Sequence, residues 1–217
     1  MPVTFVFIVV SIATFCGFLY YKKFKGSKYT YFLFYLLFTF AIELVYNVVR
    51  VVYLKTDEVI FNTSISYNFY LISSFIFLFV FYRSISKNKK NRKLFNVFIG
   101  VFTLFIIINY LIFHNGFRLG INIHNLIVGS ILLLITLILF LIEIINNKEV
   151  IFNIHRSIIF WISIGLLLFY VGVIPIMITR KYLNFNEIYM SILNLLNGIM
   201  YGSFVIGFIV SNPKYNY

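Results

Sequence analysis

Long apolar segments alternate with short polar ones along the whole chain. Each apolar segment is continuous and has about the 20 residues that an α-helix needs to cross a bilayer. Strands of a membrane barrel would instead alternate polar and apolar residues over about 10 positions. The pattern therefore predicts seven membrane-spanning helices, at about residues 3–20, 31–54, 68–84, 95–113, 125–146, 157–179 and 189–211.

The composition is typical of an all-α, polytopic membrane protein. Of the residues, 62% are hydrophobic and only 11% are charged, whereas about a quarter of the residues of a soluble domain are charged. The connections between the predicted helices are short and contain no nucleotide-binding loop. We therefore expect residues 1–217 to form a single domain, a seven-transmembrane-helix bundle.

Positive charge is concentrated in alternate connections between these helices. If the N-terminus lies outside, the inner connections and the C-terminal tail hold thirteen of the 18 lysines and arginines. Lysine and arginine near the ends of membrane helices mark the cytoplasmic side. The net charge of +12 is thus mainly a topology signal, which predicts an outside N-terminus and a cytoplasmic C-terminus.

The run SKNKKNRK at 86–93 carries the densest charge of the chain. It lacks the interleaved aromatic residues on which the bases of single-stranded nucleic acid stack, so we expect no nucleic-acid partner. We interpret the run as a short cytoplasmic loop that contacts anionic lipid headgroups, each charge contributing about 1 kcal/mol. The residues assigned to this contact are Lys87, Lys89, Lys90, Arg92 and Lys93.

The second predicted helix carries an acid, an amide and a base on one face. Glu43, Asn47 and Arg50 share that face because helical positions three and four apart lie above one another. An ionisable residue at mid-bilayer costs about 2.5–3.5 kcal/mol, so we expect Glu43 to face the bundle interior. The face is either a functional site or a polar clasp between helices, whose hydrogen bonds contribute about 0.6–2 kcal/mol each.

Polar residues of the other helices gather towards the predicted outer surface. Asn194, Asn197 and Tyr201 share one face of the seventh helix, and Asn109 lies near the outer end of the fourth. The inner halves are almost entirely apolar, which predicts a polar cavity open outward and sealed inward. The alternative is that these residues only enrich the membrane interface, as tyrosine commonly does. The predicted ligand-binding residues are Glu43, Asn47, Arg50, Asn109, Asn194, Asn197 and Tyr201.

Two backbone features concern helix packing. Pro175 lies inside the sixth predicted helix, where proline removes a backbone donor and clashes with the preceding turn. We predict a kink there that serves either as a hinge or as static packing. Gly198 and Gly202 form a GxxxG pattern in the seventh helix, which favours close approach of another helix within the bundle.

Groups for catalysis or metal binding do not come together in the pattern. His114 and His124 border an outer connection, while His155 lies in an inner one, so the three cannot bind one metal. Glu143 lies near the inner end of the fifth predicted helix, where we interpret it as a surface acid that pairs with Lys148 or Arg156. No hydrolase or metalloprotease motif is present. We expect no enzymatic activity, no cofactor and no metal.

Three segments resemble a group of bacterial proteins. They are FAIELVYNVV at 40–49, Tyr67-Asn68-Phe69-Tyr70, and FWISIGLLLFYVG at 160–172. They look like small seven-helix membrane proteins of bacteria that are similar to the membrane-sensor regions of some histidine kinases. The resemblance implies a sensing or signalling role in the bacterial cytoplasmic membrane.

Three functions follow as hypotheses. The first is a receptor-like sensor or accessory signalling subunit, whose outward-facing polar pocket binds a small ligand and whose inner face contacts a membrane protein partner. The second is a small-solute or proton-coupled transporter in which Glu43 titrates. The third is a structural subunit whose polar face contacts a helix of a larger complex. The sequence names neither the ligand nor the partner.

Overall fold

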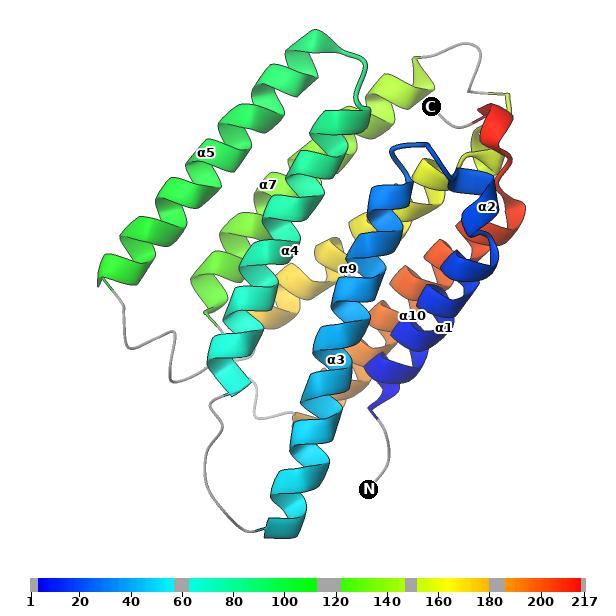
Figure 1. The fold of residues 1–217 in the computed structure, drawn as a ribbon. Helices are drawn as coiled ribbons and strands as arrows, with labels where there is room; N and C mark the ends of the chain where they lie inside the picture. Colours follow the sequence, from blue (N-terminus) through cyan, green and yellow to red (C-terminus); the bar gives the residue numbers. More distant parts are fainter. Residues whose placement is uncertain (1–3, 57–62, 113–121, 147–151, 180–185, 216–217) are drawn as a thin grey trace.

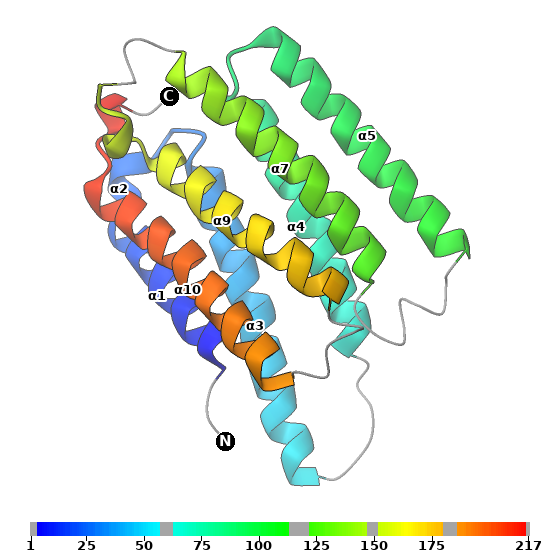
Figure 2. The same ribbon diagram turned by 180° about the vertical axis from the view of Figure 1, so that it is seen from behind.

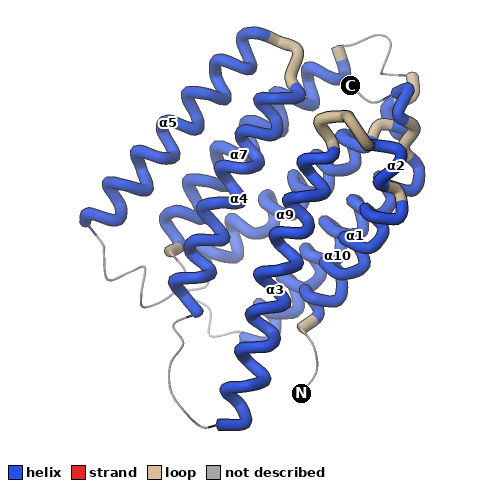
Figure 3. The backbone as a smooth tube through the Cα atoms, in the orientation of Figure 1, coloured by secondary structure: helices blue, strands red, loops and turns tan. Residues whose placement is uncertain are grey.

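The computed structural model of the protein describes residues 4–56, 63–112, 122–146, 152–179 and 186–215, without the side chains of 50–56, 63–65 and 186–187. Within these ranges the chain is helical and contains no strand (Figures 1 and 3). Consecutive long helices run in opposite directions. The long helices are α1 (Phe5–Leu19), α3 (Thr30–Thr56), α4 (Thr63–Ile85), α5 (Lys89–Ile112), α7 (Ile123–Ile145), α9 (Ile158–Thr179) and α10 (Asn186–Val210).

Short elements complete one end of the bundle. These are α2 (Tyr21–Phe24) and the 3-10 helices η1 (Ile154–Arg156) and η2 (Pro213–Tyr215). They lie where α1, α4, α7 and α10 end (Figure 1). Gly26, in the turn from α2 to α3, has a φ of 81°, a left-handed conformation that glycine adopts without steric cost.

The lengths and apolarity of the helices make this an all-α, polytopic membrane protein. Six of the described helices, α3, α4, α5, α7, α9 and α10, are long and apolar enough to cross a bilayer. The apolar helix α1 has 15 residues, or about 22 Å of rise. Large hydrophobic side chains are also exposed around the bundle, for example Leu111 at 71% and Phe15 at 64%, as expected for a surface covered by lipid.

Six helices close into a ring, and the seventh packs outside it. The order around the ring is α1, α3, α4, α7, α9 and α10, with α10 returning to α1. Helix α5 lies outside the ring and packs mainly against α4 and α7 (Figures 1 and 2). The inward faces of α3, α4, α9 and α10 therefore share the centre of the bundle, from which α5 is excluded.

Close packing of α9 against α10 depends on glycine. A Cβ atom added at Gly165 would lie 2.9 Å from the Ser203 Cβ, and one at Gly207 would lie 2.9 Å from the Trp161 Cβ. The predicted GxxxG pair contributes less: Gly198 faces Phe5 of α1 at 3.5 Å, and Gly202 meets open space. Small residues thus let two membrane helices approach closely, but mostly at other positions than the pattern indicated.

The predicted helix boundaries agree with the structure except at two starts. Helix α4 begins at Thr63, before the predicted 68, and α5 begins at Lys89 within the run predicted as a loop. That loop prediction was wrong. Asn88 caps α5, because its side-chain oxygen accepts a hydrogen bond from the backbone N–H of Lys90 at 2.9 Å and its carbonyl accepts one from Arg92 at 3.0 Å. Apolarity marks where the membrane begins, and a capped helix extends beyond that point.

Candidate functional site

A carboxylate and several phenols lie on three helices of the ring, towards the end away from the short elements. Glu43 of α3 is half-buried. Its charge interacts with the phenols of Tyr67 and Tyr70 on the neighbouring α4, and with that of Tyr201 on α10 across the ring. No described residue forms a hydrogen bond or ion pair with this carboxylate. The Glu43 carboxylate therefore lies within electrostatic range of phenols on two other helices, of which Tyr67 is 38% exposed and Tyr201 is buried.

Hydroxyl groups continue this polar region towards the middle of the bundle. The Tyr70 hydroxyl donates to the Thr39 Oγ1 at 3.5 Å, and Thr39 in turn donates to the Tyr35 carbonyl at 3.0 Å. Ser74 lies beside the phenols of Tyr35 and Tyr70, but its buried hydroxyl has no hydrogen-bond partner of good geometry. Because buried polar groups are almost always hydrogen-bonded, Ser74 is a donor that a polar ligand could satisfy.

Aromatic rings fill the other half of the interior. The ring centroid of Phe32 lies 5.1 Å from that of Phe204 and 5.7 Å from that of Phe81, and Tyr35 stacks on Phe77 at 5.1 Å. Phe32 and Phe204 are fully buried. These contacts join α3, α4 and α10. Among the described residues the polar region beside Glu43 therefore ends at an apolar plug.

Asn47 joins α3 to the start of α1. Its side-chain oxygen accepts a hydrogen bond from the Thr4 backbone N–H at 3.3 Å, and its amide donates to the Thr4 hydroxyl at 3.2 Å and to the Glu43 carbonyl at 2.8 Å. Thr4 also caps α1 by accepting from the Phe7 N–H at 3.3 Å. Asn47 thus forms a polar clasp. The side chain of Arg50 lies outside the described residues, and only its backbone is placed, within α3.

Helix α10 brings Tyr201 to the region of Glu43. Tyr201 is buried and packs its ring edge-on against Phe204 at 5.5 Å. Asn197 lies one turn away and is also buried, and its amide donates to the Leu193 carbonyl at 2.8 Å. Asn194 is half-buried two turns from Tyr201. The predicted stripe of α10 therefore lies on its inward face, and Tyr201 is within electrostatic range of the carboxylate.

Asn109 belongs to a different cluster. Its amide donates to the side-chain oxygens of Asn122 at 3.0 Å and Asn125 at 2.7 Å, and the backbone N–H of Asn122 donates to the Asn68 side chain at 2.8 Å. All four asparagines are buried between α4, α5 and α7. Since α5 lies outside the ring, the structure does not bring Asn109 together with Glu43.

Pro175 lies in the last turns of α9. The helix continues through it to Thr179, whose hydroxyl donates to the Pro175 carbonyl at 2.8 Å. The proline ring is exposed on the outside of the bundle. Its predicted hinge role stays a prediction.

Glu143 of α7 lies at the end of the bundle that carries the lysines and arginines, here called the basic end, and it has a larger structural role than a surface ion pair. Its carboxylate accepts hydrogen bonds from the Ser86 hydroxyl, the Lys87 and Asn88 backbone N–H groups and the Asn91 amide, at 2.7, 2.7, 2.9 and 2.7 Å. It therefore binds the positive end of α5, a favourable position for an anion. An acid at the end of an apolar helix, opposite a polar turn rich in N–H donors, was the only signal for this role.

The residues predicted to contact lipid headgroups all have exposed side chains. Lys87 lies in the turn before α5, and the others lie in its first two turns. Every lysine and arginine whose side chain the structure describes lies at this end of the bundle. The described residues contain no group of three or more histidine, cysteine, aspartate or glutamate side chains that could bind a metal.

Comparison of the chain with protein-family models, with curated proteins and with solved structures gives no match. The resemblance to the membrane-sensor regions of histidine kinases therefore stays a prediction. Functional conclusions depend on the geometry and the chemistry of the residues themselves.

Proposed function

We propose that the protein is a receptor-like or accessory signalling subunit of the bacterial cytoplasmic membrane that binds a small polar ligand beside Glu43. The observation that carries the proposal is a half-buried carboxylate that no described residue bonds, within electrostatic range of the phenols of Tyr67, Tyr70 and Tyr201. Aromatic faces and a carboxylate both attract cations, so an organic ammonium group is the favoured ligand. The Ser74 hydroxyl adds a hydrogen-bond donor for a polar substituent.

The proposed orientation places the Glu43 end of the bundle outside the cell. The lysines and arginines whose side chains the structure describes lie at the opposite end, and such residues favour the cytoplasmic side. A fluorescent protein that matures only in the cytoplasm, fused after Tyr217, should fluoresce. A dark but correctly inserted fusion would reverse the orientation and would place the ligand on the cytoplasmic side.

Occupancy of the site would act on three helices that extend to the basic end. Glu43, Tyr70 and Tyr201 come from α3, α4 and α10, and the aromatic plug joins the same three helices. A ligand shifts a conformational equilibrium only by its differential affinity for the two states. Closure of the phenols around a bound cation would provide that difference, and a membrane partner would respond to the altered packing at the inner end.

Binding to the purified protein tests the proposal. Alkylammonium ions of increasing size are titrated into protein in detergent, with thermal melting and calorimetry as readouts. Glu43→Gln should abolish binding and leave the melting temperature of the free protein nearly unchanged, because no described residue bonds this carboxylate. Glu143→Gln is the matched control: it makes the same chemical change at the other end and should retain binding. Equal loss of binding in both variants would contradict the proposed site.

The apolar plug favours binding over transport, because it interrupts the polar region. Flux into proteoliposomes separates the two functions. Uptake of the same ions that is lost in Glu43→Gln would establish the transporter. Absence of both binding and flux, together with stability that depends on a co-purified membrane protein, would establish the structural subunit.

A further inference from the structure

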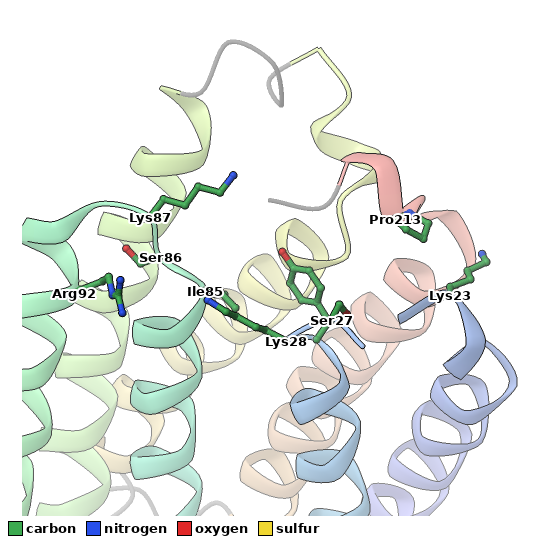
Figure 4. Close-up of a pocket in the computed structure, with 9 residues that line it drawn as sticks. Lys23, Ser27, Lys28, Ile85, Ser86, Lys87, Arg92 and Pro213 are labelled. Atoms are coloured by element: carbon green, nitrogen blue, oxygen red, sulfur yellow. The ribbon is translucent and has the colours of Figure 1, made fainter. Parts of the chain in front are cut away.

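A pocket of about 550 Å³ opens at the basic end of the bundle, opposite Glu43 (Figure 4). It lies where three segments far apart in the sequence meet: the α2–α3 turn, the α4–α5 turn and η2. Its volume falls within the range of about 300–1,000 Å³ that is typical of small-molecule sites. The residues that line it are Lys23, Ser27, Lys28, Tyr29, Ile85, Ser86, Lys87, Arg92 and Pro213.

The lining is strongly cationic. Lys23, Lys28, Lys87 and Arg92 contribute positive charge, and none of the described lining residues is acidic. Among the described residues, the acid beside the pocket is Glu143, which already accepts four hydrogen bonds from the α4–α5 turn and its neighbours. The lining therefore has an excess of positive charge that an anion would offset.

Two of the cations are held in place by helix ends. The Lys23 ammonium donates to the Ile209 carbonyl at 3.2 Å, at the C-terminus of α10. The Lys28 ammonium donates to the Ser84 carbonyl at the end of α4. Cations are stabilised near helix C-termini by the helix dipole. Lys23 also donates to the Phe208 carbonyl at 3.5 Å. Because each ammonium carries three donors, Lys23 retains one N–H group for another acceptor, and Lys28 retains more than one.

We infer that this pocket binds a phosphate-bearing anion. Arginine recognises phosphate through two parallel hydrogen bonds, and lysine binds it as a point charge. The volume exceeds that of a bare ion and fits a phosphorylated headgroup or a small phosphorylated solute. This site goes beyond the proposed function, since it lies at the other end of the molecule. A membrane lipid and a soluble phosphoester share the chemistry, and the experiment distinguishes them.

Lysine acylation of the wild-type protein in a zwitterionic detergent provides the first test. Phosphatidic acid in mixed micelles, glycerol phosphate and inorganic phosphate are added at matched ionic strength, with phosphatidylcholine as the neutral control. Lys23, Lys28 and Lys87 should be protected clearly more than Lys89 and Lys93, which line no part of the pocket. Protection by phosphatidic acid alone assigns the site to lipid, and protection by glycerol phosphate or inorganic phosphate assigns it to a soluble anion. Uniform protection, or none, overturns the inference.

Charge-matched double variants provide the second test. Lys87→Gln with Arg92→Gln removes two charges from the pocket, and Lys89→Gln with Lys93→Gln removes two from the adjacent exposed surface. Phosphatidic acid and glycerol phosphate binding should fall about tenfold or more in the first pair, because directed charge-assisted hydrogen bonds are lost. In the second pair it should fall clearly less, because Lys89 and Lys93 line no part of the pocket and contribute only a diffuse attraction to headgroups. An equal fall in both pairs would show a diffuse field and overturn the inference.

Discussion

Replacing Glu143 by alanine should detach the α4–α5 turn from α7. The carboxylate accepts four hydrogen bonds of 2.7–2.9 Å, two from the backbone of Lys87 and Asn88 and two from the side chains of Ser86 and Asn91. In Glu143→Ala all four donors lose this acceptor, and the positive end of α5 loses its anion.

The magnitude depends on how many of these donors regain water. Hydrogen bonds to a charged group contribute about 1.5–3 kcal/mol each when both partners are buried. Lys87 and Asn88 are exposed, so their N–H groups can be solvated, whereas Ser86 is only 3% exposed. We therefore expect Glu143→Ala to lower the free energy of unfolding by about 2–4 kcal/mol. Glu143→Gln should have a smaller effect, because one acceptor oxygen remains.

Denaturant titration in detergent and hydrogen exchange together test this expectation. The amides of Lys87 and Asn88 should exchange about tenfold faster in Glu143→Ala. Ser84→Ala is the control, because the Ser84 hydroxyl donates at 2.7 Å to Phe81 within the same helix, and its loss should change stability by less than about 0.5 kcal/mol. Wild-type stability with unchanged exchange of the two amides would refute the role of Glu143.

Two further substitutions test packing and the asparagine cluster. Gly165→Ala should lower the free energy of unfolding by about 1–3 kcal/mol through overpacking, since the new Cβ would lie 2.9 Å from that of Ser203. At Gly202 an added Cβ meets open space, so Gly202→Ala should be neutral or stabilising by up to about 1 kcal/mol. Equal melting temperatures in the two variants would contradict the role of Gly165. Asn109→Ala should cost about 1–3 kcal/mol, because it leaves the buried Asn125 side-chain oxygen without its donor and removes one of the two donors to Asn122. It should not change ammonium binding beside Glu43; loss of that binding would show that the two clusters are coupled.

The membrane helices could be predicted from the sequence because their signal is local. A continuous apolar run indicates a span regardless of what the helix contacts, and each predicted span coincides with a helix. The start of α5 could not be predicted in the same way. Lys89 and its neighbours are polar, yet they are helical because the Asn88 side chain accepts from the Lys90 N–H, and Glu143 fixes the turn before the helix by accepting from the N–H groups of Lys87 and Asn88.

Part of the candidate site was also predictable, because the signals for it are local to single helices. The cost of a carboxylate in lipid indicated an inward Glu43, and helical spacing indicated that Asn194, Asn197 and Tyr201 share a face. The same reasoning could not separate Asn109 from Glu43. Both lie towards the same end of their helices, but only the position of α5 outside the ring keeps them apart.

Residue type and spacing alone therefore establish a helical membrane bundle with a sheltered acid, because the free energy of transferring a side chain into lipid does not depend on its partners. The tertiary structure alone decided that Asn47 binds Thr4, that Glu143 binds the α4–α5 turn and that four cations share one pocket. Such contacts join distant parts of the chain. A helical pattern defines a direction about one axis, but which helix lies in that direction depends on how all the helices pack.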